Sequence, residues 1–221
     1  MTSDSADQLS TDARLDTAAS SALAGLVSVI LPVYNAGATV DRALASVVGQ
    51  TYSPLEIIAV DDGSRDDTVA RVRRWMPKCD LRLIVQPENG GPAAARNAGL
   101  AAARGAYVAF LDSDDEWLPE KTGMQVRALE ANPVASFCAC DEYWNYPDGT
   151  IVTTRDALDP RNWGARAWKR LLARSCIHTS SVMVRREHVV MVGGFEALSG
   201  RNVPACMPVW RENQRHLRGA P

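Results

Sequence analysis

An apolar run that stops at a group of carboxylates is the strongest constraint on the fold of this chain. Residues 107–111 read Tyr-Val-Ala-Phe-Leu, and Asp112, Asp114 and Asp115 follow at once. A short continuous apolar run predicts a strand buried on both faces of a sheet, so the carboxylates would emerge at the sheet edge. In open α/β sheets that edge is where ligands bind.

The Asp-Ser-Asp spacing of residues 112–114 suits a hard divalent cation. Carboxylate oxygens are the ligands that Mg²⁺ or Mn²⁺ prefers, and such an ion keeps several waters while sharing other positions with substrate phosphates. A solvated acidic turn after a strand would have the same local sequence. The metal-site interpretation therefore depends on the motifs found elsewhere in the chain.

Apolar segments typical of strands alternate with helical patterns through the first half of the chain. We expect strands at 26–35, 55–60 and 81–85 and a fourth that ends at Asp112, separated by helices at 38–49, 66–76 and 92–104. This order predicts an α/β fold with a mostly parallel central sheet and helices on both faces. The strand ends at 32–35, 61–64 and 112–115 should then converge on one edge of the sheet.

The second half is expected to add further elements to the same domain. These are helices at 119–131, 163–173 and 185–192, strands at 134–140, 151–154 and 177–184, and a turn at 146–150. Residues 1–25 lack a clear apolar periodicity, which predicts a disordered leader. Residues 26–200 would form the folded domain, and 201–221 an irregular tail.

Composition excludes several classes of protein. The chain has 221 residues, is 46% hydrophobic and 23% charged, and carries a net charge of −2, which argues against a nucleic-acid partner because phosphate binding needs a basic face. Its five cysteines lack metal-site spacing and no secretory signal is present, so we expect reduced thiols in a cytoplasmic protein. No apolar run approaches the roughly 20 residues of a membrane span, although peripheral membrane association stays open.

A few chemically capable residues have simpler explanations. His178 and His188 are not part of a group of residues with the spacing of metal ligands, so packed or surface roles are expected. Cys138 and Cys140 would share one face of a strand, where burial in the core explains both. Trp117, just after the acidic turn, is a candidate to approach a bound ligand.

An ordered set of short segments resembles the family 2 glycosyltransferases of GT-A fold, and the resemblance runs from about residue 26 to residue 200. The matching segments are Val27–Asn35, Gln50–Tyr52, Glu56–Ile58, Val60–Ser64, Asn89–Gly99, Gly105–Pro119, Ser180–Val182 and Val192–Phe195. The resemblance implies transfer of a sugar from a nucleotide-diphosphate donor, with a UDP-sugar expected, to a saccharide or glycoconjugate hydroxyl with inversion. It also implies a role in cell-surface polysaccharide assembly.

The resemblance also implies roles for particular residues. Donor binding would fall to Pro32, Val33, Tyr34, Asp62, Arg96, Asp112 and Ser113, and binding of Mg²⁺ or Mn²⁺ to Asp114 with Asp112. Asp62 would accept a hydrogen bond from the base, leaving Asp61 to cap the local turn. Arg96 would either contact the base or phosphates or form an ion pair with a neighbouring carboxylate.

The chain departs from the family after residue 195. The family continues to a Glu-Asp pair whose Asp is the general base, but here no carboxylate lies between Glu196 and Glu212, and Pro204 and Pro208 exclude a regular helix. We hypothesise that the reading frame is shifted or cut near Gly200. The catalytic base is then unknown, and neither Glu196 nor Glu212 is favoured as its replacement.

Three functions are consistent with these observations. The first is a metal-assisted glycosyltransferase. The second is a non-catalytic, truncated remnant that binds the nucleotide-sugar without turnover. The third is another metal enzyme, such as a nucleotidyltransferase or a phosphatase with an aspartyl nucleophile, but the downstream Lys and acidic partners that such a phosphatase needs are absent at the required spacing.

Overall fold

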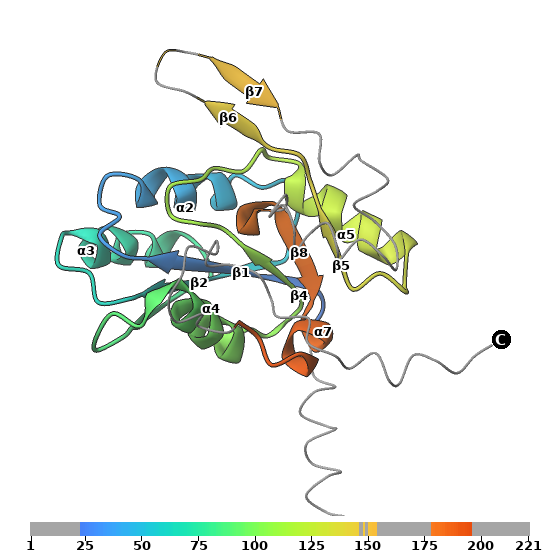
Figure 1. Ribbon diagram of the computed structural model, residues 1–221, viewed down its shortest axis with the longest axis horizontal. Helices are drawn as coiled ribbons and strands as arrows, with labels where there is room; N and C mark the ends of the chain where they lie inside the picture. Colours follow the sequence, from blue (N-terminus) through green and yellow to red (C-terminus); the bar gives the residue numbers. More distant parts are fainter. Residues whose placement is uncertain (1–22, 146–147, 149, 154–177, 196–221) are drawn as a thin grey trace, which may run out of the picture.

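The computed structural model describes residues 23–145, 148, 150–153 and 178–195 (Figure 1). The predictions for most of the leader, for the helix at 163–173 and for the tail at 201–221 lie outside the described residues.

A six-stranded sheet with the strand order β3-β2-β1-β4-β8-β5 forms the centre of the protein. Its parallel strands are β1 (Leu23–Val33), β2 (Leu55–Asp61), β3 (Leu81–Val85) and β4 (Gly105–Phe110). The short strands β8 (Val182–Arg185) and β5 (Phe137–Ala139) complete the sheet, β8 running antiparallel to both β4 and β5. The predicted mostly parallel sheet is confirmed.

Helices cover both faces of this sheet, as predicted (Figure 1). One face packs against α2 (Val40–Val48), α3 (Thr68–Arg73) and α5 (Lys121–Ala131), the other against α4 (Gly91–Ala102) and α7 (Arg186–Met191). Side chains alternate along β1, so they pack into the hydrophobic cores on both faces of the sheet. Val29 and Leu31 pack into the core beneath α2, α3 and α5, and Ile30 packs into the core beneath α4 and α7. All three are fully buried, which explains why the strand reads as continuously apolar.

Several boundaries differ from the prediction. β1 begins at Leu23, inside the expected leader, because the Leu23 N–H donates to the Arg104 carbonyl (3.2 Å) and extends the pairing with β4. The strand expected at 177–184 starts only at Val182, since a 3₁₀ turn, η3 (Thr179–Ser181), precedes it. The helix at 66–76 ends at Arg73, and a second 3₁₀ turn, η1 (Met76–Lys78), follows with Pro77 in its first turn.

The strand expected at 151–154 does not join the main sheet. It forms β7 (Ile151–Thr153), which among the described strands pairs with β6 (Tyr143–Asn145) alone, in a separate antiparallel hairpin. Figure 1 shows this hairpin extending away from the sheet beyond β5.

A buried carboxylate holds the amino-terminal edge of the parallel strands together. The Glu56 side chain is fully buried, and it accepts hydrogen bonds from Ser28 Oγ, from Arg82 Nη2 (2.8 Å) and from the backbone N–H and Nε of Arg104 (2.7 and 2.8 Å). Burial alone would raise the Glu56 pKa, but the hydrogen bonds from Ser28 and Arg104 outweigh it and hold that pKa below its ordinary value. This edge is therefore structural.

We expect Glu56→Ala to lower the free energy of unfolding by about 3 kcal/mol, because it leaves the partners of a buried carboxylate uncompensated. The folded pKa of Glu56 is lowered, so its contribution is present above the ordinary value of 4.5 and is lost as the pH falls through the folded pKa. Urea denaturation at several pH values measures both effects. Asp80→Ala, which removes a half-exposed partner of Arg104, is the control, and equal losses from the two variants would contradict the assignment.

Candidate functional site

A cleft of about 340 Å³ opens at the carboxyl ends of β1, β2 and β4, beside the start of α4. Its volume lies within the range of small-molecule sites, roughly 300–1,000 Å³. The lining residues are Pro32, Val33, Tyr34, Asp62, Asn89, Gly91, Pro92, Ala95, Arg96, Asp112, Ser113 and Asp114. The structure thus brings every predicted donor-binding and metal-binding residue to one cleft, while what they bind stays a prediction.

Four lining residues just before Arg96 had no predicted site role, although Arg96 on the same expected helix did. Asn89, Gly91, Pro92 and Ala95 line the cleft from the loop before α4 and from the first turns of that helix. Their place beside the strand ends follows from the parallel topology, which would have been the signal for including them.

Parallel pairing sets the positions of the first two cleft-forming loops. Val33 and Asp61 are partners at the ends of β1 and β2, and the Asp62 N–H donates to the Val33 carbonyl (2.9 Å). Tyr34 and Asp62 are the next residues along the chain, so they lie side by side just beyond the ends of two neighbouring strands.

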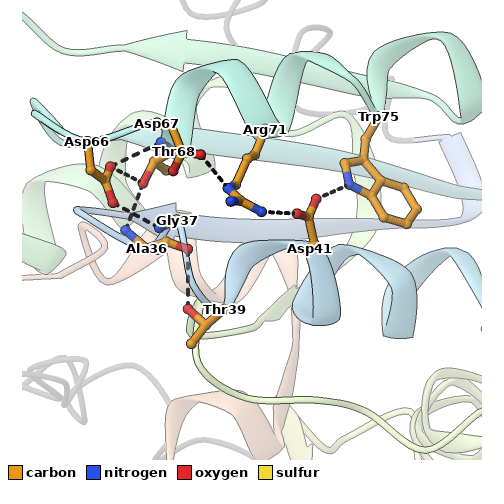
Figure 2. Close-up of polar contacts among 9 residues, drawn as sticks. All are labelled: Ala36, Gly37, Thr39, Asp41, Asp66, Asp67, Thr68, Arg71 and Trp75. Carbon is orange, nitrogen blue, oxygen red and sulfur yellow. Dashed lines mark hydrogen bonds and ion pairs between the residues drawn. The ribbon is translucent and has the colours of Figure 1, made fainter.

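Those two loops are also bonded to each other (Figure 2). The Ala36 N–H donates to Thr68 Oγ1 (2.7 Å), and the Gly37 N–H donates to Asp66 Oδ2 (3.0 Å). Asp66 also accepts from the backbone N–H of Thr68 (3.0 Å) and from its hydroxyl, and the Thr68 hydroxyl bond is the main cause of a lowered Asp66 pKa. The loop after β1 is therefore fixed to the start of α3.

A second set of bonds in Figure 2 joins the helices behind these loops. The Asp41 carboxylate, on α2, accepts from Arg71 Nη1 and from Trp75 Nε1, each at 2.8 Å. The Trp75 bond is the main reason that the Asp41 pKa is lowered. Together the two sets of bonds join α2, α3 and the loops after β1 and β2 to one another, next to the cleft residues Tyr34 and Asp62.

We expect Asp66→Ala to lower the free energy of unfolding by about 1.5 kcal/mol, since it removes the acceptor for two backbone N–H groups and a hydroxyl. The neighbouring variant Asp67→Ala is a matched control, because the half-exposed Asp67 side chain bonds through Oδ2 to Arg71 (2.8 Å) and its loss should have a smaller effect. Thermal unfolding of both variants measures the difference. A greater loss in the Asp67 variant would contradict this description.

Asp61, the last residue of β2, and Asp62, which follows it, both have local structural roles, whereas only Asp61 was expected to have one. Asp61 Oδ2 accepts the Ser64 N–H (3.2 Å), as expected of a turn cap. Asp62 accepts the Gly90 N–H at Oδ1 and the Gly91 N–H at Oδ2, each at 2.8 Å, because the first N–H groups of α4 need acceptors. Each Asp62 oxygen keeps a second lone pair, so the carboxylate can still accept a bond from a ligand.

Arg96 forms an ion pair, one of the two outcomes left open by the sequence. Its side chain is 2% exposed, and its guanidinium donates to the Asp112 carboxylate from α4. From the other side, Ser180 Oγ in η3 accepts the Asp112 N–H (3.0 Å). Asp112 is thus held between two elements, which fixes the position of the acidic turn.

Asp114 is the carboxylate of the acidic turn that is available to a cation. The Asp115 N–H donates to the Asp112 carbonyl (3.1 Å) and closes the turn, leaving the exposed Asp114 side chain with no hydrogen-bond or ion-pair partner among the described residues. Burial, together with the charges of Asp114 and Asp112, raises the pKa of Asp115. In the described part of the chain no three His, Cys, Asp or Glu side chains gather into a ready-made metal cage.

Trp117 does not approach the cleft, contrary to expectation. Its side chain is buried beneath the acidic turn, where Nε1 donates to the Ser180 carbonyl (2.8 Å) and Lys121 Nζ lies 3.9 Å from the ring centroid. Burial lowers the Lys121 pKa to about 8. A partner for the indole N–H and a cation for its face explain why this tryptophan packs in the core instead.

The cysteines and histidines of the described residues make no metal site. Cys79, Cys138 and Cys140 are free thiols, and burial raises the pKa of Cys138 to about 11, as expected of packed rather than reactive groups. His188 is partly exposed beside Glu187 (3.8 Å). His178 has a closer partner, described below.

Comparison with known proteins agrees with the architecture. The Staphylococcus aureus protein TarS, residues 1–349 with UDP, superimposes with a TM-score of 0.64 at 22% identity, covering 77% of this chain and 50% of that one. The mannosyltransferase PcManGT of Pyrobaculum calidifontis, with GDP-Man and Mn²⁺, gives a TM-score of 0.59 at 28% identity and covers 77% and 47%. The fold is therefore the α/β GT-A fold that the resemblance implied.

Sequence comparison then assigns the family. The model of glycosyl transferase family 2 matches residues 28–191, most of the chain, and the protein belongs to this family of enzymes. An uncharacterized glycosyltransferase of Haemophilus influenzae is 33% identical over 172 residues, which are 76% of this chain and 65% of the relative. The Escherichia coli UDP-Glc:alpha-D-GlcNAc-diphosphoundecaprenol beta-1,3-glucosyltransferase WfaP is 37% identical over 142 residues, 63% and 55%.

The chain spans between about half and two thirds of the length of these relatives. Among its described helices, none has the length and apolar character needed to cross a membrane.

Proposed function

We propose that this chain binds a UDP-sugar together with Mg²⁺ or Mn²⁺ and that it acts as a glycosyltransferase. It transfers the sugar, with inversion, to a saccharide hydroxyl. The observation that carries the proposal is the cleft in which the ends of β1, β2 and β4 meet beside Asp114, whose carboxylate has no partner in the part of the chain that the structure describes. Family membership supports the reaction class.

The cleft differs in character from one end to the other. Pro32, Tyr34 and Pro92 offer apolar surface and an exposed aromatic ring, which suits a nucleoside. Asp62 lies beside them and can accept a hydrogen bond from an N–H of the base. The acidic turn lies at the other end, so a nucleotide bound in this orientation would direct its diphosphate toward Asp114.

The residues of the acidic turn fit a divalent cation. Asp114 presents an exposed carboxylate that no other described residue binds, and Asp112, oriented by Arg96, lies two residues away. Few protein ligands suit such an ion, because waters and diphosphate oxygens complete its coordination. When bound, the cation would stabilise the negative charge that develops on the departing diphosphate. The Mn²⁺ and GDP-Man held by PcManGT support this assignment.

The relatives guide the choice of substrates. WfaP is named for transfer of glucose from UDP-Glc to a GlcNAc-diphosphoundecaprenol acceptor, and TarS was crystallised with UDP-GlcNAc as well as with UDP. UDP-glucose is therefore the first donor to test, and a diphospholipid-linked saccharide is the first acceptor. Such an acceptor would bring the protein to the membrane surface as a peripheral partner, and we place the reaction in the cytoplasm, where free thiols stay reduced.

A nucleotide-sugar-binding remnant without turnover is the alternative. The specific observation that favours it is the lack of a carboxylate between Glu196 and Glu212, where the family pattern has its base. Donor binding without consumption of the donor would establish this alternative.

With Mn²⁺ present, we expect UDP to bind Asp114→Ala at least about tenfold more weakly than the unaltered chain, a difference of about 1.4 kcal/mol. Without Mn²⁺, we expect the two proteins to bind UDP with the same weak affinity. The physical reason is that Asp114 holds the cation that bridges protein and diphosphate. Isothermal titration calorimetry of UDP with and without Mn²⁺ measures both affinities.

The matched control is Glu116→Ala. Glu116 lies in the same acidic segment, but its exposed carboxylate pairs with Arg42 (3.2 Å) outside the cleft. This variant should bind UDP like the unaltered chain. Mn²⁺-dependent affinity that persists in the Asp114 variant would contradict the proposed metal site.

A further inference from the structure

The sheet order places His178 across the acidic turn from the nucleotide cleft. β4 lies between β1 and β8, and the cleft is built on the side of β1, β2 and α4. His178 precedes η3 on the other side, two residues before the Ser180 hydroxyl that accepts the Asp112 N–H. His178 therefore lies on the β8 side of the acidic turn, the side to which a donor with its base in the cleft and its diphosphate at Asp114 can extend its sugar.

The residues after β5 come to the same edge of the sheet. β5 and β4 both run antiparallel to β8, so they share one direction and their carboxyl ends lie at one edge. The Cys140 N–H donates to the Ser181 carbonyl (3.2 Å), which joins the end of β5 to η3. Glu142 and Trp144, which follow, are thereby brought next to His178.

His178 has the local surroundings of an oriented base. Its Nδ1 lies 2.6 Å from Glu142 Oε2, and its ring packs against Trp144 with centroids 5.3 Å apart at 63°. The His178 side chain is 45% exposed, whereas that of Glu142 is 21% exposed. A carboxylate that accepts Nδ1–H fixes the tautomer and leaves the Nε2 lone pair for a proton. The aromatic contact further restricts the ring.

The other described histidine has no comparable surroundings. His188 lies on α7, and its recorded ion-pair contact among the described residues is with Glu187 at 3.8 Å.

We propose that His178 is the base of the transfer reaction and that Glu142 is its positioning residue, which rests on the proposed function. The acceptor hydroxyl gives its proton to His178 Nε2 as its oxygen forms a bond to the anomeric carbon. The bond from that carbon to the diphosphate oxygen breaks, and its electron pair leaves with the nucleoside diphosphate. The imidazolium formed is stabilised by the Glu142 carboxylate. This arrangement supplies a base in a chain whose sequence lacks the family's Glu-Asp pair.

Hydrolysis of UDP-glucose in the presence of Mn²⁺ tests the proposal, because water is the simplest acceptor and loses its proton in the same step. We expect His178→Gln to lower kcat about 100-fold, within the usual contribution of a general base, while KM for UDP-glucose changes less than about twofold. Glu142→Gln should lower kcat by about tenfold, also without a change in KM. His188→Gln is the matched control and should leave both constants unchanged.

Calorimetric measurement of UDP binding by the same proteins, with Mn²⁺ present, distinguishes a failure of the base assignment from a failure of the proposed function. Binding that is intact in every variant, with kcat lost only in the His178 and Glu142 variants, supports the proposal. Unchanged hydrolysis in His178→Gln, absent hydrolysis by an unaltered chain that binds UDP, or a loss of UDP affinity in His178→Gln would each overturn it. If the unaltered chain binds no UDP, the proposed function fails, and this inference fails with it.

Discussion

Asp112 is held from both sides of β4, and this double attachment is the constraint on which the site depends. Arg96 reaches its carboxylate from α4, and Ser180 accepts its backbone N–H from η3. The first contact ties the acidic turn to the nucleotide cleft, and the second ties it to the side of the sheet where His178 lies. Asp114 is consequently presented at a fixed point between them, where a metal-bound diphosphate would have to be positioned.

The two edges of the parallel sheet use carboxylates in opposite ways. At the amino-terminal edge, Glu56 is fully buried and its oxygens are saturated by Ser28, Arg82 and Arg104, so its charge serves stability. At the carboxyl edge, Asp114 is exposed and has no partner among the described residues. A satisfied carboxylate contributes to the fold, whereas an available one can bind a ligand, and the same residue type takes either role according to its surroundings.

The sequence predicted the positions that depend on strand periodicity and parallel topology. Pro32 lies near the end of an apolar run, and Asp62 and Asp114 come shortly after two others. Parallel strands bring their carboxyl ends together, so the convergence of these residues on one cleft could be foreseen. The burial of Trp117 could not, because it depends on the Ser180 carbonyl and Lys121 being beneath the turn. Nor could the pairing of Glu142 with His178, which are far apart in the sequence and meet only through the antiparallel strands β5 and β8.

The position of Mn²⁺ in crystals grown with UDP would decide whether Asp114 holds the cation, because anomalous diffraction locates the ion independently of the protein atoms. We expect one strong anomalous peak within coordinating distance of Asp114 and of the diphosphate, with the uracil between Tyr34 and Asp62. A peak bound elsewhere on the protein, or UDP lying outside the cleft at the ends of β1, β2 and β4, would contradict it.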